Sequence, residues 1–195
     1  PQYLLLTDDK FSDGGPMEGI KYMLAPPLRK KHDNDALWNG LSNGDIQVVA
    51  TDHCPFTIEE KQANVADFRR CPGGVSGVEE RMPLLFSEGV LKGRLTPERF
   101  VQVTATNAAR IFGISHKGDI KEGYDADLVI INPTDTHEFN AHTLHTTCHY
   151  SPYEGITAHC SIERVFLRGT LIAEHNEFRG QRGGGTLLHR RRTEV

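Results

Sequence analysis

The sequence predicts a mixed α/β fold in which an α/β front part is followed by an all-β tail. Two observations support this prediction, and a third indicates that the chain has no membrane-spanning helix. Apolar runs with strand character alternate with amphipathic helical stretches in the front part. Near residue 117 the pattern changes to short alternating runs separated by glycine turns. Apolar runs of the ~20 residues needed to cross a bilayer do not occur.

The front part begins with a predicted strand, helix and strand. Residues 19–25, GIKYMLA, form the first strand, and residues 45–50, DIQVVA, form the second. Between them a helix capped by Asp33 or Asn34 ends at Gly44. The apolar residues of this helix share one face: Leu37, Trp38 and Leu41. Strand, helix and strand with short joints are typical of a right-handed βαβ unit in a parallel sheet.

A long connection and two helices follow. Residues 55–77 are rich in glycine, proline and charge, and connections of this length are usually functional. Residues 79–92 predict a helix that ends at Gly93. Its inner face consists of Met82, Leu85, Phe86 and Val90. The stretch Thr96-Pro97-Glu98 is a strong helix start, and that helix ends at Gly113.

The tail contains two predicted strand pairs. The segment KGDIKEGYDADLVIINP reads as a turn-rich pair with bends at Gly118 and Gly123. The segment SIERVFLRGTLIAEHNEF reads as a hairpin whose strands are joined near Arg168-Gly169.

Composition narrows the classes of partner. Of the 195 residues, 37% are hydrophobic and 25% are charged, and the formal net charge is −4. This mild acidity indicates neither a nucleic-acid nor a membrane partner. The run Arg190–Arg192 is read as a solvated tail. The four cysteines form no CxxC pair, and the N-terminus has no signal-peptide pattern, so we expect reduced thiols and a cytoplasmic protein.

A polar cluster follows the second predicted strand. In VVATDHCPF an apolar run stops at Asp52, His53 and Cys54. Catalytic groups of parallel α/β barrels lie at the carboxyl ends of strands, where a carboxylate can bind a metal or act as a general base. The alternative is that Asp52 caps the following turn while His53 packs or is exposed. We expect Cys54 to be a small buried filler rather than a nucleophile.

Histidine spacing offers little further support for a metal centre. No two of the ten histidines stand at positions i and i+2, the spacing that places two side chains on one face of a strand. His142, His145 and His149 have helical spacing, but they lie in NAHTLHTTCHY, which is rich in β-branched residues. Surface or packing histidines are therefore expected at these three positions.

Five segments, in order and spacing, resemble dihydropyrimidinases (hydantoinases) of the amidohydrolase superfamily: YMLAPPLRKK, LWNGLSNGDIQVVATDHCPF, PGGVSGVEERMPLLFSEGV, TNAARIFG and KGDIKEGYDADLVIINP. The likeness covers essentially the whole chain, as far as the tail GQRGGGTLLHRR. It implies a (β/α)8 barrel with a side β-sandwich built from both chain ends. Residues 1–116 would be the C-terminal part of the barrel, and residues 117–195 the β-sandwich part and tail.

The resemblance also implies an activity. Family members open the cyclic amide of dihydropyrimidines or hydantoins to N-carbamoyl amino acids, using two divalent metal ions, usually Zn²⁺. Asp52 matches an aspartate that ligates one metal, takes a proton from the bridging hydroxide and delivers it to the leaving nitrogen. Ala25 and Gly73 match substrate-contacting backbone. The family has serine at the first of these positions and asparagine at the second, so the ring specificity stays open.

The remaining family ligands are an HxH pair, a carboxylated lysine and two further histidines, and they belong upstream of PQYLLL. A barrel takes about 250 residues, so we read this chain, which opens without a methionine, as the C-terminal portion of the enzyme. Alone it would bind metal poorly and catalyse nothing. By resemblance, the intact enzyme is a homo-oligomer, commonly a tetramer, acting on a small cyclic amide or ureide.

Two other groups of proteins share part of this pattern. Allantoinases and dihydroorotases carry similar DHAP strings, but GVSGVEERMP, SPYEG and GGGTLL favour the hydantoinase side. Non-catalytic relatives such as the collapsin response mediator proteins act through assembly and replace the aspartate at the position of Asp52. The presence of Asp52 favours the enzyme.

Overall fold

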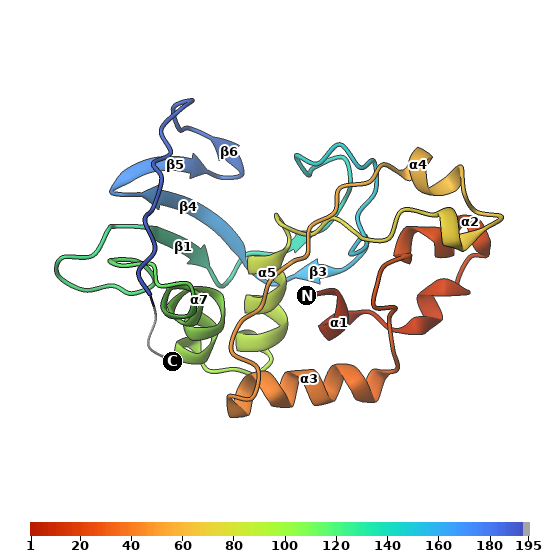
Figure 1. Cartoon of the computed structure of the whole chain (residues 1–195), viewed down its shortest axis with the longest axis horizontal. Helices are drawn as coiled ribbons and strands as arrows, with labels where there is room; N and C mark the ends of the chain where they lie inside the picture. The colour runs from red at the N-terminus through yellow and green to blue at the C-terminus, as the bar shows by residue number, and fades with distance from the viewer. Residues whose placement is uncertain (193–195) are drawn as a thin grey trace.

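The computed structural model describes residues 1–192, with helices in the front part of the chain and strands in the tail (Figure 1). The sheet lies at one end of the molecule, α2 and α4 lie at the other, and α5 stands between them. The α-helices are α1 (Gln2–Leu5), α2 (Pro16–Gly19), α3 (Lys31–Asn43), α4 (Ile58–Gln62), α5 (Arg81–Leu85), α6 (Pro97–Val101) and α7 (Asn107–Ile111). Short 3₁₀ helices are η1 (Asp8–Phe11), η2 (Ile20–Tyr22) and η3 (Phe68–Arg70), and π-helical stretches are η4 (Phe86–Leu91) and η5 (Gln102–Thr106). The strands are β1 (Leu128–Asn132), β2 (His137–Glu138), β3 (Thr157–Ala158), β4 (Ser161–Leu167), β5 (Thr170–Glu174) and β6 (Glu177–Phe178).

Helix α3 confirms the first predicted helix. Trp38 and Leu41 of its predicted apolar face are 4% and 1% exposed, and the chain leaves the helix at Gly44 with a left-handed φ of 101°. The predicted cap was wrong by one turn. Lys30 is the N-cap residue, and Asp33 in the third helical position accepts the backbone N–H of Lys30 at 3.0 Å.

The strand predicted over residues 19–25 was wrong, because the segment begins as α2 and η2. Pro16 at the first position of α2 has a φ already suited to a helix. Ile20 is buried within η2, and Met23 then has an extended backbone with a φ of −66° and a ψ of 114°, so the buried Leu24 lies after the helical turn. The helical start at Pro16 therefore continues to Tyr22, where the prediction placed a strand.

The strand predicted over residues 45–50 does not form a ladder with any described residue. Val49 instead donates its N–H to the carbonyl of Val103 in η5, at 2.9 Å. Parallel pairing occurs three residues beyond the predicted strand, as an isolated bridge between His53 and Val75. A strand exists only with a partner, so the predicted βαβ unit is absent from the described part of the chain.

The two later helices confirm their predicted starts and ends closely. One runs through α5 and η4, begins at Arg81 and turns at Gly93 with a φ of 70°. The other runs through α6, η5 and α7 and ends at Gly113 with a φ of 64°. Its cap is the predicted one, because Thr96 Oγ1 accepts the N–H of Arg99 at 3.1 Å.

The tail forms an antiparallel sheet in the order β1-β4-β5-β6 and a small β2-β3 ribbon. The β4-β5 hairpin confirms the prediction, because Leu167 pairs with Thr170 across a two-residue turn. Arg168 and Gly169 in that turn both have positive φ, as a type I′ turn requires.

The strand pair predicted before this hairpin was wrong. Only β1 forms there, and it pairs with β4 rather than with its own neighbour in sequence. The preceding residues form a loop in which the Lys117 ammonium lies 2.8 Å from the Asp125 carboxylate and also pairs with Asp127. Gly118 and Gly123 have positive φ at the predicted bends.

Two apolar clusters support the molecule. The first lies around α3, α5 and α6 and contains Leu4, Trp38, Leu41, Val49, Leu85, Leu95, Phe100 and Val103. The second contains Leu6, Leu24, Leu28, Val75, Leu84, Phe139, Tyr153 and Ala158. Leu24 and Val75 of the second cluster lie close to Ala25 and Gly73 in the chain. Burial of these two side chains therefore fixes the positions of both segments. Among the described residues, no helix has the length and apolar character that a bilayer span requires.

The buried carboxyl of Glu80 should make stability depend on pH. Its side chain is 2% exposed, and Ser151 Oγ donates to it at 2.9 Å. Burial raises the pKa of Glu80 above its usual 4.5. As the pH rises, the folded state therefore retains a proton that the unfolded state loses. The contribution of Glu80 to the free energy of unfolding is complete below pH 4.5 and is lost as the pH rises through the raised pKa.

We expect Glu80→Gln to gain stability relative to the parent chain as the pH rises from below 4.5 toward neutrality. Urea unfolding at a series of pH values measures this difference. Glu138→Gln, at an exposed position of β2, is the control. Parallel pH profiles for Glu80→Gln and the parent chain would contradict the account.

Candidate functional site

Three segments distant in sequence meet beside the end of the VVAT run. Cys54 donates its N–H to the carbonyl of Val75 at 2.9 Å. Gly74, the preceding residue, donates its N–H to the carbonyl of Met23 at 3.0 Å. The Gly73 segment therefore lies between the Asp52 segment and the Ala25 segment. The structure brings together the backbone that carries all three predicted site residues, while their contacts with a substrate remain a prediction.

Asp52 is exposed and has a left-handed backbone with a φ of 50°. Aspartate is one of the few residues that adopt this conformation readily, and such conformations cluster at functional sites. The preceding residues are fixed by side chains from elsewhere. Gln2 Nε2 donates to the carbonyl of Thr51 at 3.2 Å, and an Arg81 guanidinium nitrogen donates to the carbonyl of Val49 at 3.1 Å.

The alternative role for Asp52, as a cap of the following turn, was wrong for the helix that follows. Helix α4 is capped by Thr57, whose hydroxyl accepts the N–H of Glu60 at 3.2 Å. Asp52 precedes this cap by five residues, and a tight turn in which Phe56 donates its N–H to the carbonyl of Cys54 at 2.9 Å lies between them. The exposed carboxylate of Asp52 is therefore available for chemistry.

Tyr3 is a residue at this site that the sequence did not indicate. Its hydroxyl donates to the carbonyl of Pro26 at 2.6 Å, directly after the exposed Ala25. Burial raises the pKa of the Tyr3 phenol, and the negative charge of Asp52 raises it further. Tyr3 thus contacts the Ala25 segment and lies within the field of Asp52.

Lys61 joins the other two segments and was also missed. Its side chain is fully buried, and its ammonium donates to the carbonyl of Met23 at 2.8 Å and to that of Pro72 at 3.2 Å. Burial lowers the pKa of Lys61. In the sequence it stands among charges in IEEKQ, which gave no signal that it is buried. Only the tertiary structure reveals this bridge between the neighbours of Ala25 and Gly73.

The two adjacent glycines have different roles. A Cβ at exposed Gly73 would meet nothing within 4 Å, so a side chain fits there. A Cβ at Gly74 would lie 2.4 Å from the Cβ of Cys54, and Gly74 has a φ of 144°. The close approach of the backbone to Cys54 therefore requires glycine at position 74. Position 73, the predicted substrate-contacting residue, has space for a side chain.

The cysteines do not form a reactive cluster. All four are free; Cys54 is half-buried against Gly74, which agrees in part with the predicted buried filler. Cys71, Cys148 and Cys160 are buried, and burial raises the pKa of Cys160 to about 11. Burial also raises the pKa of Cys71, so the thiols of Cys71 and Cys160 pack rather than react.

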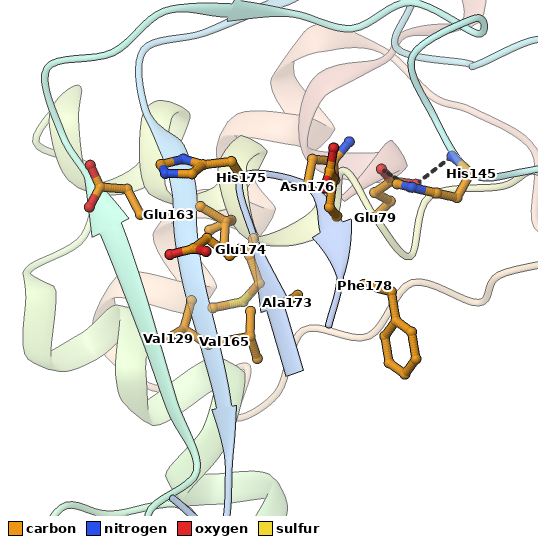
Figure 2. A pocket seen from close by; sticks show the side chains of 13 residues that line it. Glu79, Val129, His145, Glu163, Val165, Ala173, Glu174, His175, Asn176 and Phe178 are labelled. Carbon is orange, nitrogen blue, oxygen red and sulfur yellow. Dashed lines mark hydrogen bonds and ion pairs between the residues drawn. The ribbon is translucent and has the colours of Figure 1, made fainter. Parts of the chain in front are cut away.

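The three histidines with helical spacing lie on the surface, as expected. His145 Nδ1 is 3.1 Å from Glu79 Oε1, and His149 Nδ1 is 3.3 Å from Glu59 Oε1. Figure 2 shows His145 and Glu79 beside a cavity of about 350 Å³. Sheet residues including Val129, Val165 and Ala173 line this cavity, and none of the three predicted site residues does.

A complete metal centre is not present in the described part of the chain. No group of three or more His, Cys, Asp or Glu side chains there could hold an ion. Asp52 fits as a single ligand, because its carboxylate is exposed and carboxylate oxygens bind divalent cations.

Comparison with known proteins identifies relatives of this arrangement. The model of the amidohydrolase family matches residues 16–172. The D-phenylhydantoinase of Escherichia coli O139:H28 is 45% identical over 193 residues, which are 98% of this chain and 41% of that protein. A D-hydantoinase from Bacillus sp. AR9 superposes with a TM-score of 0.95 at 38% identity, over 100% of this chain and 43% of that one. A dihydropyrimidinase from Brevibacillus agri NCHU1002 gives a TM-score of 0.91 at 40% identity, over 95% and 40%.

These matches confirm the predicted mixed α/β fold as that of the hydantoinases and dihydropyrimidinases. The chain spans about two fifths of the length of these relatives, with 41% of the Escherichia coli protein covered. The boundary predicted near residue 117 stays a prediction.

Substitution of the two adjacent glycines should separate their roles. Gly74→Ala should lower the free energy of unfolding by about 2 kcal/mol or more, because it adds a clash with Cys54 at a positive φ. Gly73→Ala should leave it nearly unchanged, because a Cβ there meets nothing. Urea unfolding measures both variants. Equal losses for the two would show that the Gly74–Cys54 approach does not fix this segment.

Proposed function

The chain belongs to the amidohydrolase family, and from that premise we propose that it is the C-terminal portion of a cyclic amidase that hydrolyses dihydropyrimidines or hydantoins to N-carbamoyl amino acids. The relatives at 45% and 40% identity are named as a phenylhydantoinase and a dihydropyrimidinase. The observation that supports the proposal most is the meeting of the Asp52, Ala25 and Gly73 segments through the Gly74 and Cys54 hydrogen bonds.

In this proposal Asp52 moves the proton. A water oxygen attacks the ring carbonyl carbon, and the Asp52 carboxylate accepts the proton that the water loses. The ring C–N bond then breaks, and Asp52 delivers that proton to the leaving nitrogen. The products are a carboxylate and an N-carbamoyl group on one open chain. The exposed position of Asp52 suits this role, because the carboxylate must reach both water and ring.

The Ala25 and Gly73 segments would hold the ring. Cyclic ureides present alternating N–H and C=O groups, which backbone carbonyls and amides can match. Both residues are exposed, and neither has a side chain beyond Cβ that would keep a ring from the backbone. Tyr3 and Lys61 would keep the segments at a fixed separation by bonding Pro26 on one side and both Met23 and Pro72 on the other.

The proposal includes two divalent metal ions, Zn²⁺, in the intact enzyme. Bound metals would supply water activation near neutral pH and polarisation of the ring carbonyl. From this chain, Asp52 would bind one of them. The proposal further takes residues 1–116 as the C-terminal part of a (β/α)8 barrel and residues 117–195 as part of a β-sandwich. We propose a homotetramer from the resemblance, and a cytoplasmic location from the cysteine pattern.

Asp52→Asn tests the role of the carboxylate. In a full-length hydantoinase with this chain as its C-terminal part, the variant should open hydantoin about 10³-fold more slowly. Its circular dichroism spectrum should be unchanged, because the side chain is exposed. Release of the N-carbamoyl product is the measurement.

Asp45→Asn, at another exposed aspartate before the same apolar run, is the matched control and should retain full activity. An Asp52→Asn enzyme as active as the Asp45→Asn enzyme would remove Asp52 from the mechanism.

A further inference from the structure

We propose that His53 is a positioning residue whose Nδ1 atom holds the loop of residues 73–78 against the segment that carries Asp52. The proposal rests on the proposed function, because it gives His53 the task of placing Gly73 for a substrate. It assigns the residue no contact with substrate or metal.

The geometry of the His53 ring supports the proposal. Nδ1 accepts the backbone N–H of Gly77 at 3.1 Å and that of Val78 at 3.3 Å. An imidazole nitrogen that accepts N–H bonds has a free lone pair, so the ring proton lies on Nε2. One side-chain atom thus satisfies two successive backbone donors from residues 24 and 25 positions later in the chain.

The main chain of His53 holds the same loop. His53 forms a parallel bridge with Val75, and the next residue, Cys54, donates its N–H to the Val75 carbonyl at 2.9 Å. The ring and the backbone of one short segment therefore attach the loop at two places, residue 75 and residues 77–78. With two attachments the loop cannot rotate about either one alone.

The middle of the loop is buried, while its two ends, Gly73 and Val78, are exposed. Ser76 is 1% exposed, and a Cβ at Gly77 would lie 3.3 Å from the ring of Tyr153. Gly73 is exposed and has empty space where its Cβ would lie. The His53 ring thus fixes the loop where its buried stretch ends, and from that stretch the chain extends back to the exposed backbone of Gly73 proposed to meet the substrate.

A rival role would use the other nitrogen. If His53 acted on a metal or a proton through Nε2, the position of that atom would matter and Nδ1 would be incidental. Two substitutions of His53 by amide side chains distinguish the positioning role from this rival role, because the two side chains differ in length. Asparagine places a carbonyl oxygen where Nδ1 lies, and glutamine places one near the position of Nε2.

The experiment measures amide hydrogen exchange by NMR in the 195-residue chain and in its His53→Asn and His53→Gln variants. The reporters are the amides of Gly77 and Val78. The buried helical amides of Leu84 and Phe100 report on the fold as a whole. In His53→Gln, Gly77 and Val78 should exchange about tenfold faster or more, because they lose their acceptor. His53→Asn should stay close to the parent chain, and the helical amides should be unchanged in both.

Three results would overturn the proposal. His53→Gln could retain slow exchange at Gly77 and Val78, which would show that the ring does not hold them. His53→Asn could exchange as fast as His53→Gln, which would show that an acceptor at the Nδ1 position is not enough. The Leu84 and Phe100 amides could accelerate equally, which would make His53 a general stability residue.

Steady-state kinetics test whether the position of the loop affects substrate binding. In a full-length hydantoinase with this chain as its C-terminal part, His53→Gln should raise KM for hydantoin about tenfold with kcat nearly unchanged, and His53→Asn should restore KM. A fall in kcat with unchanged KM would overturn the positioning role. If no hydantoin is opened by the parent enzyme, the proposed function fails, and the exchange result still decides whether His53 holds the loop.

Discussion

The hydrogen bond from the Cys54 N–H to the Val75 carbonyl, 2.9 Å long, is the contact on which the candidate site depends. This hydrogen bond joins Val75, near the end of the long connection, to Cys54, the residue just before the connection begins. Once this hydrogen bond is formed, Gly74 lies against the Cys54 side chain and its N–H reaches the carbonyl of Met23. Three segments thereby line up through two backbone hydrogen bonds.

Burial of the apolar side chains next to the site residues fixes which residues of these segments are exposed. Val75 is 1% exposed and Leu24 is 6% exposed, so the residues next to the open Gly73 and Ala25 belong to an apolar cluster. A slip of one residue in either segment would expose these side chains and bury the open ones. Lys61 reinforces the same spacing, because its buried ammonium needs the Met23 and Pro72 carbonyls as partners.

The features that could be predicted from the sequence are those determined by neighbours in the chain. The cap at Thr96, the helix end at Gly113 and the Arg168-Gly169 turn each depend on a few adjacent residues, and each has the predicted form. The segments 19–25 and 45–50 failed for different reasons. In the first, Pro16 starts a helix before the apolar run, and the backbone becomes extended only at Met23. In the second, a strand needed a partner that the described residues do not supply.

The candidate site shows the same division. Asp52 could be found because an acid after an apolar run is a local signal, and its match to a family motif added a role. Tyr3 and Lys61 could not be found, because a tyrosine in PQYLLL and a lysine in IEEKQ acquire meaning only from contacts tens of residues away. The role of His53 could not be found either, since the backbone N–H groups that its ring accepts lie 24 and 25 residues later in the chain.

The central claim is that the backbone itself assembles these three segments. NMR scalar couplings across hydrogen bonds test it most directly, because they connect a donor nitrogen with the carbonyl carbon of its acceptor. The account predicts a coupling from the Cys54 nitrogen to the Val75 carbonyl carbon and another from the Gly74 nitrogen to the Met23 carbonyl carbon, both in metal-free protein. If both couplings were missing and the Cys54 and Gly74 amides exchanged as freely as an unfolded chain, the claim would be contradicted.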